Sequence, residues 1–249
     1  MLVEIKKYNR VYKYEKDDTN SFHRILTDFE KKKNLSFYKN HFYLDKKWEC
    51  KKSIKKISEK EIENKKQKES LRTRDVFSIL EKWGLIPPKQ KPAKILDIGC
   101  GAGMFIKEWE ERKYGEGHGI ELSNIAKDIS PKAKIEFLDA NAIRNTHIEN
   151  DVCLVVALDV FEHLFDVSLV LQTIFSKIIN GTKILIEIPI VHDNITIEGL
   201  KTYKYLYSSR HLHLYTEKGF KKEIESSRFK ILQSETRKNG NKLLILIEK

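Results

Sequence analysis

Apolar residues between positions 53 and 83 recur at helical spacing among Lys and Glu, with neither Gly nor Pro to interrupt them. Ile62, Val76 and Leu80 are examples of this spacing. Such a period indicates an amphipathic helix. Gly84 and the prolines at 87 and 88 then break the pattern, so the sequence predicts one long helix followed by a linker.

Beyond Pro92 the pattern changes to short apolar runs separated by helical segments. The runs cover residues 93–98, 117–122, 134–138, 151–158 and 183–188, and the clearest helical segments are 104–112 and 168–179. Strands that alternate with helices form a mostly parallel sheet covered on both faces. Residues 229–235 and 242–248 flank a short turn that contains Asn239 and Gly240, which predicts an antiparallel hairpin at the carboxyl-terminal edge.

Charge divides the chain unevenly. It holds 47 Lys+Arg and 36 Asp+Glu, but residues 1–70 hold 20 of the former and 12 of the latter, a balance of +8 that leaves only +3 for residues 71–249. The first 50 residues are also rich in Tyr, Phe and Trp. We therefore expect two regions, a basic, aromatic cap over 1–70 that contacts the substrate and an α/β domain over 71–249.

The composition excludes several classes of protein. No stretch reaches the ~18 consecutive apolar residues of a membrane span, and the amino-terminal residues lack the pattern of a secretory signal. The three cysteines, Cys50, Cys100 and Cys153, are too few and too scattered for a disulfide framework or a zinc knuckle. These features predict a cytoplasmic protein.

A glycine-rich loop is the strongest chemical signal. Gly99, Gly101 and Gly103 occupy alternate positions between the apolar run 93–98 and a helical segment. Glycines allow a tight turn and let a ligand approach the backbone. The spacing differs from the G-x-G-x-x-G of pyrophosphate-binding loops, and Asp97 before the first glycine would repel a phosphate and attract an ammonium group.

Two further acidic residues follow the next two predicted strands. Glu121 lies 22 residues after Gly99, close to the ~20 residues expected for a carboxylate that binds ribose hydroxyls. Asp139 ends the third strand, where it could contact an adenine amino group. A tight turn with helix-capping acids would be the alternative without ligand binding.

Together, residues 97–103 with Glu121 and Asp139 resemble the class I S-adenosylmethionine-dependent methyltransferases, and the resemblance spans about residues 70–249. It implies a Rossmann-like, doubly wound sheet of seven strands whose last strand is antiparallel. It also implies that the glycine loop and Asp97 hold the methionine part of S-adenosylmethionine, that Glu121 binds its ribose and that Asp139 faces its adenine. Ala157 and Leu158 would line the sulfonium side, and Arg74 or Arg72 would pair with the methionine carboxylate.

A second group of polar residues follows the fourth strand. If Asp159 opens a helix, Glu162 and His163 lie at i+3 and i+4 on the same face. His211 lies five residues before Thr216, which we expect to cap a helix over 217–227. Carboxylates and imidazoles that converge in this way can bind a divalent cation, or a histidine can accept a proton from a substrate hydroxyl.

Two resemblances bear on these residues. The segment around His211 resembles sugar and quinone-precursor O-methyltransferases, in which His163 and His211 would act as catalytic base or substrate contact. It also resembles RNA 3′-terminal 2′-O-methyltransferases, which implies Mg²⁺ or Mn²⁺ bound by Asp159, Glu162, His163 and His211. This chain has Asp159 where those enzymes have Glu, and it lacks their aromatic signature after the histidine.

The sequence thus favours an S-adenosylmethionine-dependent O-methyltransferase that acts on a small anionic acceptor. Sugars, nucleotide sugars and phosphorylated precursors fit, and the resemblance points to surface polysaccharide biosynthesis. An RNA 2′-O-methyltransferase that uses the basic region 1–70 on phosphates is the first alternative. A methyltransferase fold retained as a non-catalytic partner subunit is the second.

Overall fold

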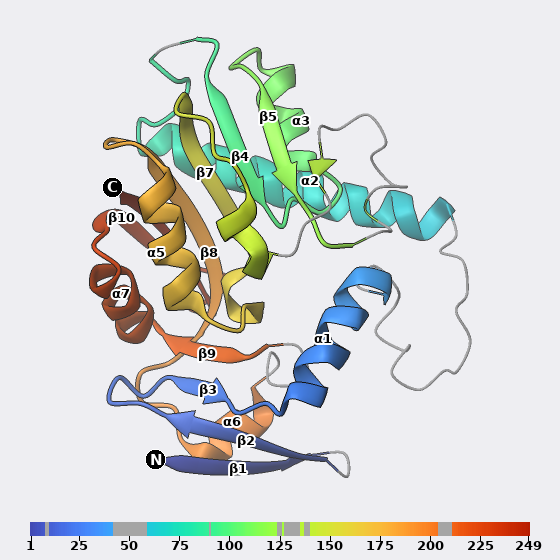
Figure 1. Cartoon of the computed structure of the whole chain (residues 1–249), viewed down its shortest axis with the longest axis vertical. Helices are drawn as coiled ribbons and strands as arrows, with labels where there is room; N and C mark the ends of the chain where they lie inside the picture. Colours follow the sequence, from blue (N-terminus) through green and yellow to red (C-terminus); the bar gives the residue numbers. More distant parts are fainter. Residues whose placement is uncertain are drawn as a thin grey trace.

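The computed structural model describes residues 1–7, 10–41, 59–89, 91–123, 126, 135–136, 140–203 and 211–249. Two sheets share one strand in this structure (Figure 1). The larger sheet carries the glycine loop, and the smaller one carries the amino-terminal strands. Expectations for Asp139 and for residues 42–58 lie outside the described residues.

Five parallel strands form the centre of the larger sheet: β4 (Lys94–Ile98), β5 (Gly117–Ile120), β6 (Ile135–Glu136), β7 (Val152–Leu158) and β8 (Lys183–Val191). β11 (Lys242–Glu248) pairs antiparallel with β8, and β10 (Lys230–Arg237) pairs antiparallel with β11. The order is therefore β6-β5-β4-β7-β8-β11-β10. This confirms the expected Rossmann-like seven-stranded sheet with its antiparallel hairpin.

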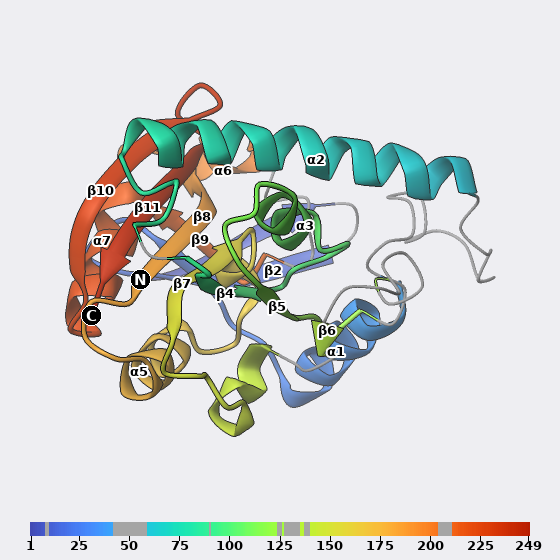
Figure 2. The same cartoon turned by 90° about the horizontal axis from the view of Figure 1, so that it is seen from above.

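Side chains of the buried strands alternate between two hydrophobic cores, as the two-residue period of a strand requires. Leu154, Val156 and Leu244 pack with α2 (Glu59–Lys82) and α3 (Met104–Glu111). Val155 and Ile245 face the other way, toward α5 (Val167–Lys177) and α7 (Glu217–Ser226). Figure 2 shows α2 and α5 on opposite sides of the sheet. Both faces are covered, as the strongly apolar strands lead one to expect.

The smaller sheet consists of β1 (Leu2–Lys7), β2 (Arg10–Lys16), β3 (Phe22–Arg24) and β9 (His213–Thr216). β9 pairs in parallel with Ile190 and Val191 at the end of β8, so β8 belongs to both sheets. Phe22 and Leu214 are buried in a third core between these strands and α6 (Ile197–Thr202). With α1 (Asp28–His41), this sheet lies beyond the carboxyl ends of β7 and β8 (Figure 1).

Most of the predicted elements occur in the structure, with one correction near the site. The predicted long helix is α2, which continues without a break through residue 70. The division of the chain into regions 1–70 and 71–249 remains a prediction. Asp159 does not open a helix: it has a left-handed φ of 59°, and the turn that follows is the short 3₁₀ helix η3 (Phe161–His163). Another 3₁₀ helix, η2 (Ala140–Asn145), precedes β7. Within the described residues, no helix combines the length and apolarity that crossing a membrane requires.

Candidate functional site

The glycine loop connects β4 to α3 and needs glycine for its backbone. Gly99, Gly101 and Gly103 have φ values of 70°, 56° and 72°, a left-handed conformation that other residues adopt at a cost of about 1–2 kcal/mol each. A Cβ at Gly99 would also lie 2.4 Å from Cγ2 of Val160. The glycines therefore bring backbone without side chains to the carboxyl end of β4, where ligands bind in such folds.

Glu121, which directly follows β5, forms a hydrogen bond with the backbone of this loop. Its Oε2 accepts a hydrogen bond from the backbone N of Gly101 at 2.8 Å, and its Oε1 accepts from the backbone N of Leu122 and of Ser123, both at 2.8 Å. Burial raises the pKa of Glu121, while these three N–H donors act in the opposite direction. Whether it also binds a ribose, as the resemblance implies, remains a prediction.

Three carboxyl groups, those of Glu69, Asp97 and Glu121, lie around the loop. Asp97 on β4 is buried, and burial, followed by the charge of Glu121, raises its pKa well above the usual range, while Arg72 acts against this shift. Glu69 on α2 accepts a hydrogen bond from the backbone N of Ala102 at 3.2 Å. Such a cluster repels phosphate and favours a ligand that carries an ammonium or sulfonium charge.

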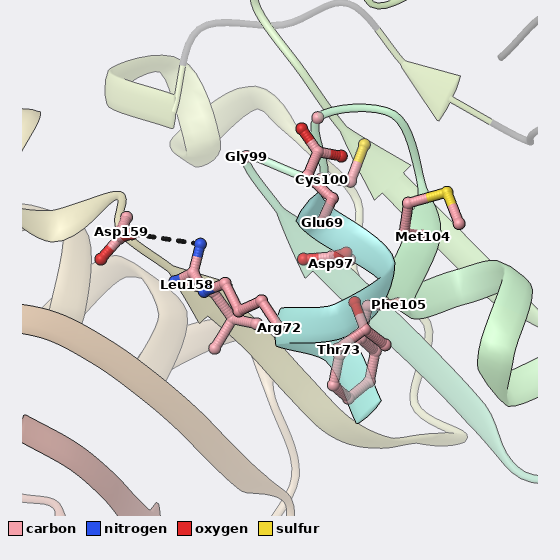
Figure 3. Close-up of a pocket in the computed structure, with 11 residues that line it drawn as sticks. Glu69, Arg72, Thr73, Asp97, Gly99, Cys100, Met104, Phe105, Leu158 and Asp159 are labelled. Atoms are coloured by element: carbon pink, nitrogen blue, oxygen red, sulfur yellow. Dashed lines mark ion pairs between the residues drawn. The ribbon is translucent and has the colours of Figure 1, made fainter. Parts of the chain in front are cut away.

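A cavity of about 190 Å³ opens between this loop, α2 and the end of β7 (Figure 3). It is lined by Glu69, Arg72, Thr73, Asp97, Gly99, Cys100, Gly101, Met104, Phe105, Leu158 and Asp159. Leu158 thus lies where the sequence places it, on the wall opposite α2. Ala157 does not: it is fully buried in the core on the α5 face, because neighbouring strand residues point to opposite sides.

The structure also decides between the two arginines of α2. Arg72 lines the cavity, whereas Arg74 is exposed and does not line it, so the expected contact of Arg74 with the cofactor remains a prediction that this arrangement does not favour. Positions two apart on a helix point in different directions, and only one of these side chains can face the cavity. Arg72 is therefore the residue of α2 that could contact a methionine carboxylate.

Arg72 belongs to a buried network of charges that the sequence did not predict. Its guanidinium donates to Oε1 of Glu187 at 2.7 Å and pairs with Asp159 at 3.1 Å. Lys242 on β11 bridges the same two carboxylates, and Arg237 also donates to Glu187. Burial alone would raise the pKa of Asp159, but the charges of Arg72 and Lys242 lower it to about 2. Glu187 is the single charged residue of the run 184–191, a signal that a buried partner was to be expected.

Glu162, His163 and His211 form a separate group. Their ligand atoms lie within 4.8 Å of one another, and the two imidazole rings are 4.8 Å apart between centroids. Burial, followed by the charge of Asp159, raises the pKa of Glu162 well above normal, and its Oε2 has no hydrogen-bond partner among the described residues. Glu162 and His163 follow Leu158 and Asp159, which line the cavity, along the chain.

The structure brings only three of the four proposed metal ligands together. Asp159 stays out of the group because its carboxylate is held by Lys242 and Arg72. One carboxylate with an unpartnered oxygen and two imidazoles still fit a divalent transition metal. Mg²⁺ fits less well, since it prefers oxygen ligands. Glu162, His163 and His211 would hold such an ion.

Comparisons with known proteins agree with this site. A family model described as a methyltransferase domain matches residues 69–234. Magnesium protoporphyrin IX methyltransferase from Synechocystis PCC 6803 has a similar structure, with a TM-score of 0.56 and 14% identity over 88% of this chain and 99% of that one. An S-adenosylmethionine-dependent methyltransferase from Archaeoglobus fulgidus matches with a TM-score of 0.53 and 18% identity, over 71% of this chain and 94% of that chain. No curated protein sequence matches.

The family match covers the glycine loop, Glu121 and the histidine pair, and the structural likeness extends the same fold over most of the chain. The acidic loop fits a sulfonium-bearing methyl donor, S-adenosylmethionine. The chain therefore belongs to the methyltransferase-domain family and is an S-adenosylmethionine-dependent methyltransferase.

Proposed function

We propose that this enzyme methylates a hydroxyl oxygen of a small anionic acceptor, and that His163 or His211 accepts the hydroxyl proton. The observation that carries the proposal is the pair of imidazoles with ring centroids 4.8 Å apart, of which His163 follows the cavity-lining Leu158 and Asp159 along the chain. An imidazole is the side chain best suited to accept a proton near neutral pH.

The proposed step is an in-line displacement. The acceptor oxygen forms a bond to the methyl carbon while the carbon–sulfur bond breaks and its electron pair stays on sulfur. The hydroxyl proton passes to a ring nitrogen of the base. The acidic glycine loop favours the sulfonium charge of the bound donor, and the fixed loop holds the donor for attack. S-adenosylmethionine supplies the methyl group, and S-adenosylhomocysteine is the second product.

The charge distribution supports an anionic acceptor. Residues 1–70 carry a balance of +8, and 71–249 only +3. The small sheet and α1 lie beyond the carboxyl ends of β7 and β8 (Figure 1), on the side where an acceptor would approach the donor. A sugar, nucleotide sugar or phosphorylated precursor, as in surface polysaccharide synthesis, carries the complementary charge.

The test is a screen of hydroxyl acceptors of this kind for the formation of S-adenosylhomocysteine. With the best acceptor, His163→Gln or His211→Gln should lower kcat by about 10²–10⁴-fold, the usual contribution of a general base, and leave S-adenosylhomocysteine binding intact. His192→Gln, at an exposed histidine outside the pair, is the matched control. Full activity of both variants of the pair would contradict the proposal.

A metal-dependent reaction is the second candidate, because three donors of suitable type converge at Glu162, His163 and His211. A bound divalent cation would polarise the acceptor hydroxyl. In this case EDTA abolishes activity, Mn²⁺ restores it, and Glu162→Gln weakens Mn²⁺ binding measured by calorimetry. If RNA is the acceptor, single-stranded RNA binds with an affinity that falls steeply with salt. Activity that survives EDTA would exclude the metal.

A further inference from the structure

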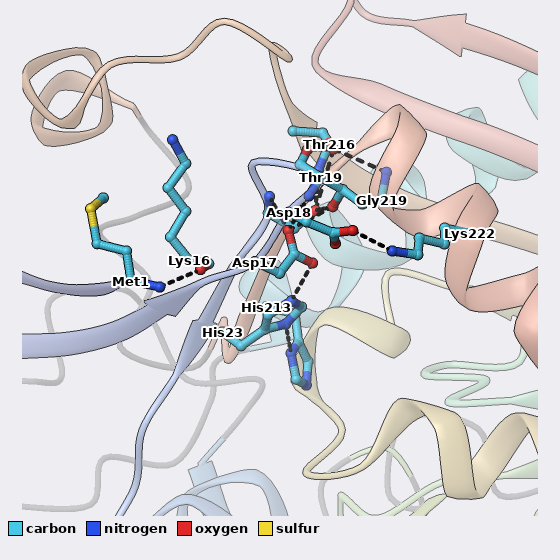
Figure 4. A network of polar contacts seen from close by, with 11 residues as sticks. Met1, Lys16, Asp17, Asp18, Thr19, His23, His213, Thr216, Gly219 and Lys222 are labelled. Atoms are coloured by element: carbon cyan, nitrogen blue, oxygen red, sulfur yellow. Dashed lines mark hydrogen bonds and ion pairs between the residues drawn. The ribbon is translucent and has the colours of Figure 1, made fainter.

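A chain of hydrogen bonds runs from the turn between β2 and β3 through His23 and His213, which Figure 4 shows, to the backbone after η3. Oδ2 of Asp17 lies 3.1 Å from Nε2 of His23, and Nδ1 of His23 lies 2.9 Å from Nδ1 of His213. Nε2 of His213 lies 2.8 Å from the carbonyl oxygen of Leu164. The chain thus joins the β2–β3 turn to β9 and to the end of η3.

One end of this relay, formed by His213 and Leu164, is adjacent to the proposed catalytic pair. Leu164 directly follows His163, and His213 lies two residues after His211. The backbone N of Leu212 also donates to the carbonyl oxygen of Glu162 at 2.7 Å. The separation and mutual orientation of the two imidazoles therefore depend on how β9 is held against η3.

The hydrogen bonds fix the number of protons on the two rings. A carbonyl and a carboxylate only accept, so Nε2 of His213 and Nε2 of His23 must both carry hydrogen. One further hydrogen must lie between the two Nδ1 atoms. Three protons on four ring nitrogens give the pair one positive charge in total, whichever ring holds it.

Burial, followed by the charge of His23, lowers the pKa of His213 to about 4. The pKa of Asp17 is lowered, despite partial burial, by its hydrogen bonds to Thr19 and His23, which favours its carboxylate form. The other titratable side chains around His23 and His213 are Glu15, Tyr215, Glu223 and Asp166.

We propose that Asp17, His23 and His213 are positioning residues, which hold β9 against η3 through this relay so that His163 and His211 face each other at the methyl donor. The role given to that pair rests on the proposed function, but the relay and its proton count do not. The amino-terminal strands then complete the catalytic centre, in addition to any contact that they make with the acceptor.

Other contacts also fasten the small sheet, and they provide matched controls. Asp18, the next residue of the same turn, pairs with Lys222 of α7 at 2.6 Å. This exposed contact joins the same turn to the larger domain without touching the relay. Asp18→Asn therefore reports the effect of loosening the turn alone.

Asp17→Asn gives the sharpest test. Oδ1 of Asp17 accepts hydrogen bonds from the backbone N of Thr19 and of Ser21 within the turn, so the amide oxygen of Asn takes this place and its NH₂ faces His23. His23 must then accept at Nε2, and the relay closes with both rings neutral. The wild-type relay needs a proton that the Asp17→Asn relay does not.

The experiment uses full-length protein with ¹⁵N-labelled histidine, bound to S-adenosylhomocysteine, and the eight His signals are assigned with His→Gln variants. In wild type, His23 should show two protonated nitrogens, and in Asp17→Asn only one. His23→Ala should shift the signals of His163 and His211, whereas Asp17→Asn and Asp18→Asn leave them in place.

Activity with an identified acceptor gives a second readout. His23→Ala should lower kcat by about tenfold or more, the usual effect of losing a residue that orients another, with the KM for S-adenosylmethionine unchanged. Two neutral rings in wild type, or unchanged His163 and His211 signals in His23→Ala, would overturn the proposal.

The outcomes also separate this proposal from the proposed function. If His163→Gln and His211→Gln are fully active but His23→Ala still shifts both signals, the relay stands and the role of the pair fails. If His23→Ala does not fold, as judged by circular dichroism, the numbers of protonated ring nitrogens in wild type and in Asp17→Asn decide the matter.

Discussion

Asp97 is expected to contribute to binding of the methyl donor, but its burial lowers the stability of the folded protein. Its carboxyl group is buried next to Glu121, and this environment raises its pKa well above the usual range. A group whose pKa is higher in the folded than in the unfolded state binds its proton more tightly when folded. The unliganded protein therefore loses stability as the pH rises above the normal carboxyl pKa.

Asp97→Asn should consequently stabilise the unliganded enzyme at pH 7 and impair donor binding. We expect a gain of about 0.5–2 kcal/mol in the free energy of unfolding, as is usual when a strained functional group is removed. The increase in Tm that S-adenosylhomocysteine gives to wild type should be largely lost. Thermal scans with and without the ligand measure both effects.

Asp193→Asn, an exposed acid away from the site, should change neither quantity. A variant Asp97→Asn that is less stable than wild type and still gains the full Tm increase would contradict this account of the residue.

At the same scale, sequence reasoning found the loop residues because their signal is local. Gly99, Gly101 and Gly103 must be glycine for reasons of backbone conformation alone. Arg72 and Arg74 could not be distinguished, since the direction of α2 relative to β4 depends on tertiary packing. The sequence could not show that Asp159 pairs with Lys242 and not with the candidate metal ligands, since Lys242 is 83 positions away along the chain.

Among the secondary-structure elements, the contact between α7 and the β2–β3 turn depends on a glycine at its centre. Thr216 caps α7 by accepting from the backbone N of Gly219, and its hydroxyl donates to the carbonyl oxygen of Thr19. Ser21 lies within the same group of hydroxyls. A Cβ at Gly219 would lie 2.0 Å from Oγ of Ser21 and 2.4 Å from Oγ1 of Thr19, so no side chain fits there.

Gly219→Ala should therefore push the small sheet away from α7 and leave the larger sheet folded. We expect a loss of about 1–3 kcal/mol in the free energy of unfolding, the usual effect of overpacking. Limited proteolysis should then cut first within residues 1–24. Urea denaturation measures the loss of stability, and mass spectrometry of the proteolytic fragments locates the first cut.

Gly199→Ala is the matched control, because a Cβ there would approach its nearest neighbours only to 3.3 Å. Equal losses of stability in the two variants would show that the contact with Ser21 and Thr19 does not matter.

The elements themselves were largely predictable, since each follows from a period of apolar residues. β4, β7, β8 and β11 correspond to apolar runs, and α3 and α5 to segments of helical period. The pairing of β3 with β9 was not predictable, because nothing local in residues 22–24 specifies a partner near residue 214. The contact between His23 and His213 was not predictable for the same reason.

For the molecule as a whole, four acidic residues near the site fall into two groups, which change the free energy of unfolding in opposite directions as the pH varies. Asp97 and Glu162 have raised pKa values, whereas Asp159 and Glu187 have lowered ones. Stabilisation by a group of the second kind is complete above its unfolded pKa, and is lost as the pH falls through its folded pKa.

In the variant Asp159→Asn, the free energy of unfolding should accordingly fall less steeply than in wild type as the pH is lowered. Wild type should lose the contribution of Asp159 between its ordinary value of 3.8 and about 2, on the order of 1–2 kcal/mol for a group of this shift. The variant should be less stable than wild type at pH 6, and the difference should disappear near pH 2. Urea midpoints over this range measure it, and a constant difference at all pH values would refute the assignment.

Sharing β8 between two sheets has a consequence for synthesis on the ribosome. β3 is made about 190 positions before β9, with which it pairs, and domains begin to fold while translation continues. β1–β3 must therefore wait for nearly the whole larger sheet before they can dock. Their aromatic and apolar side chains stay accessible during that interval, so this early-made segment is where a chaperone would bind the nascent chain.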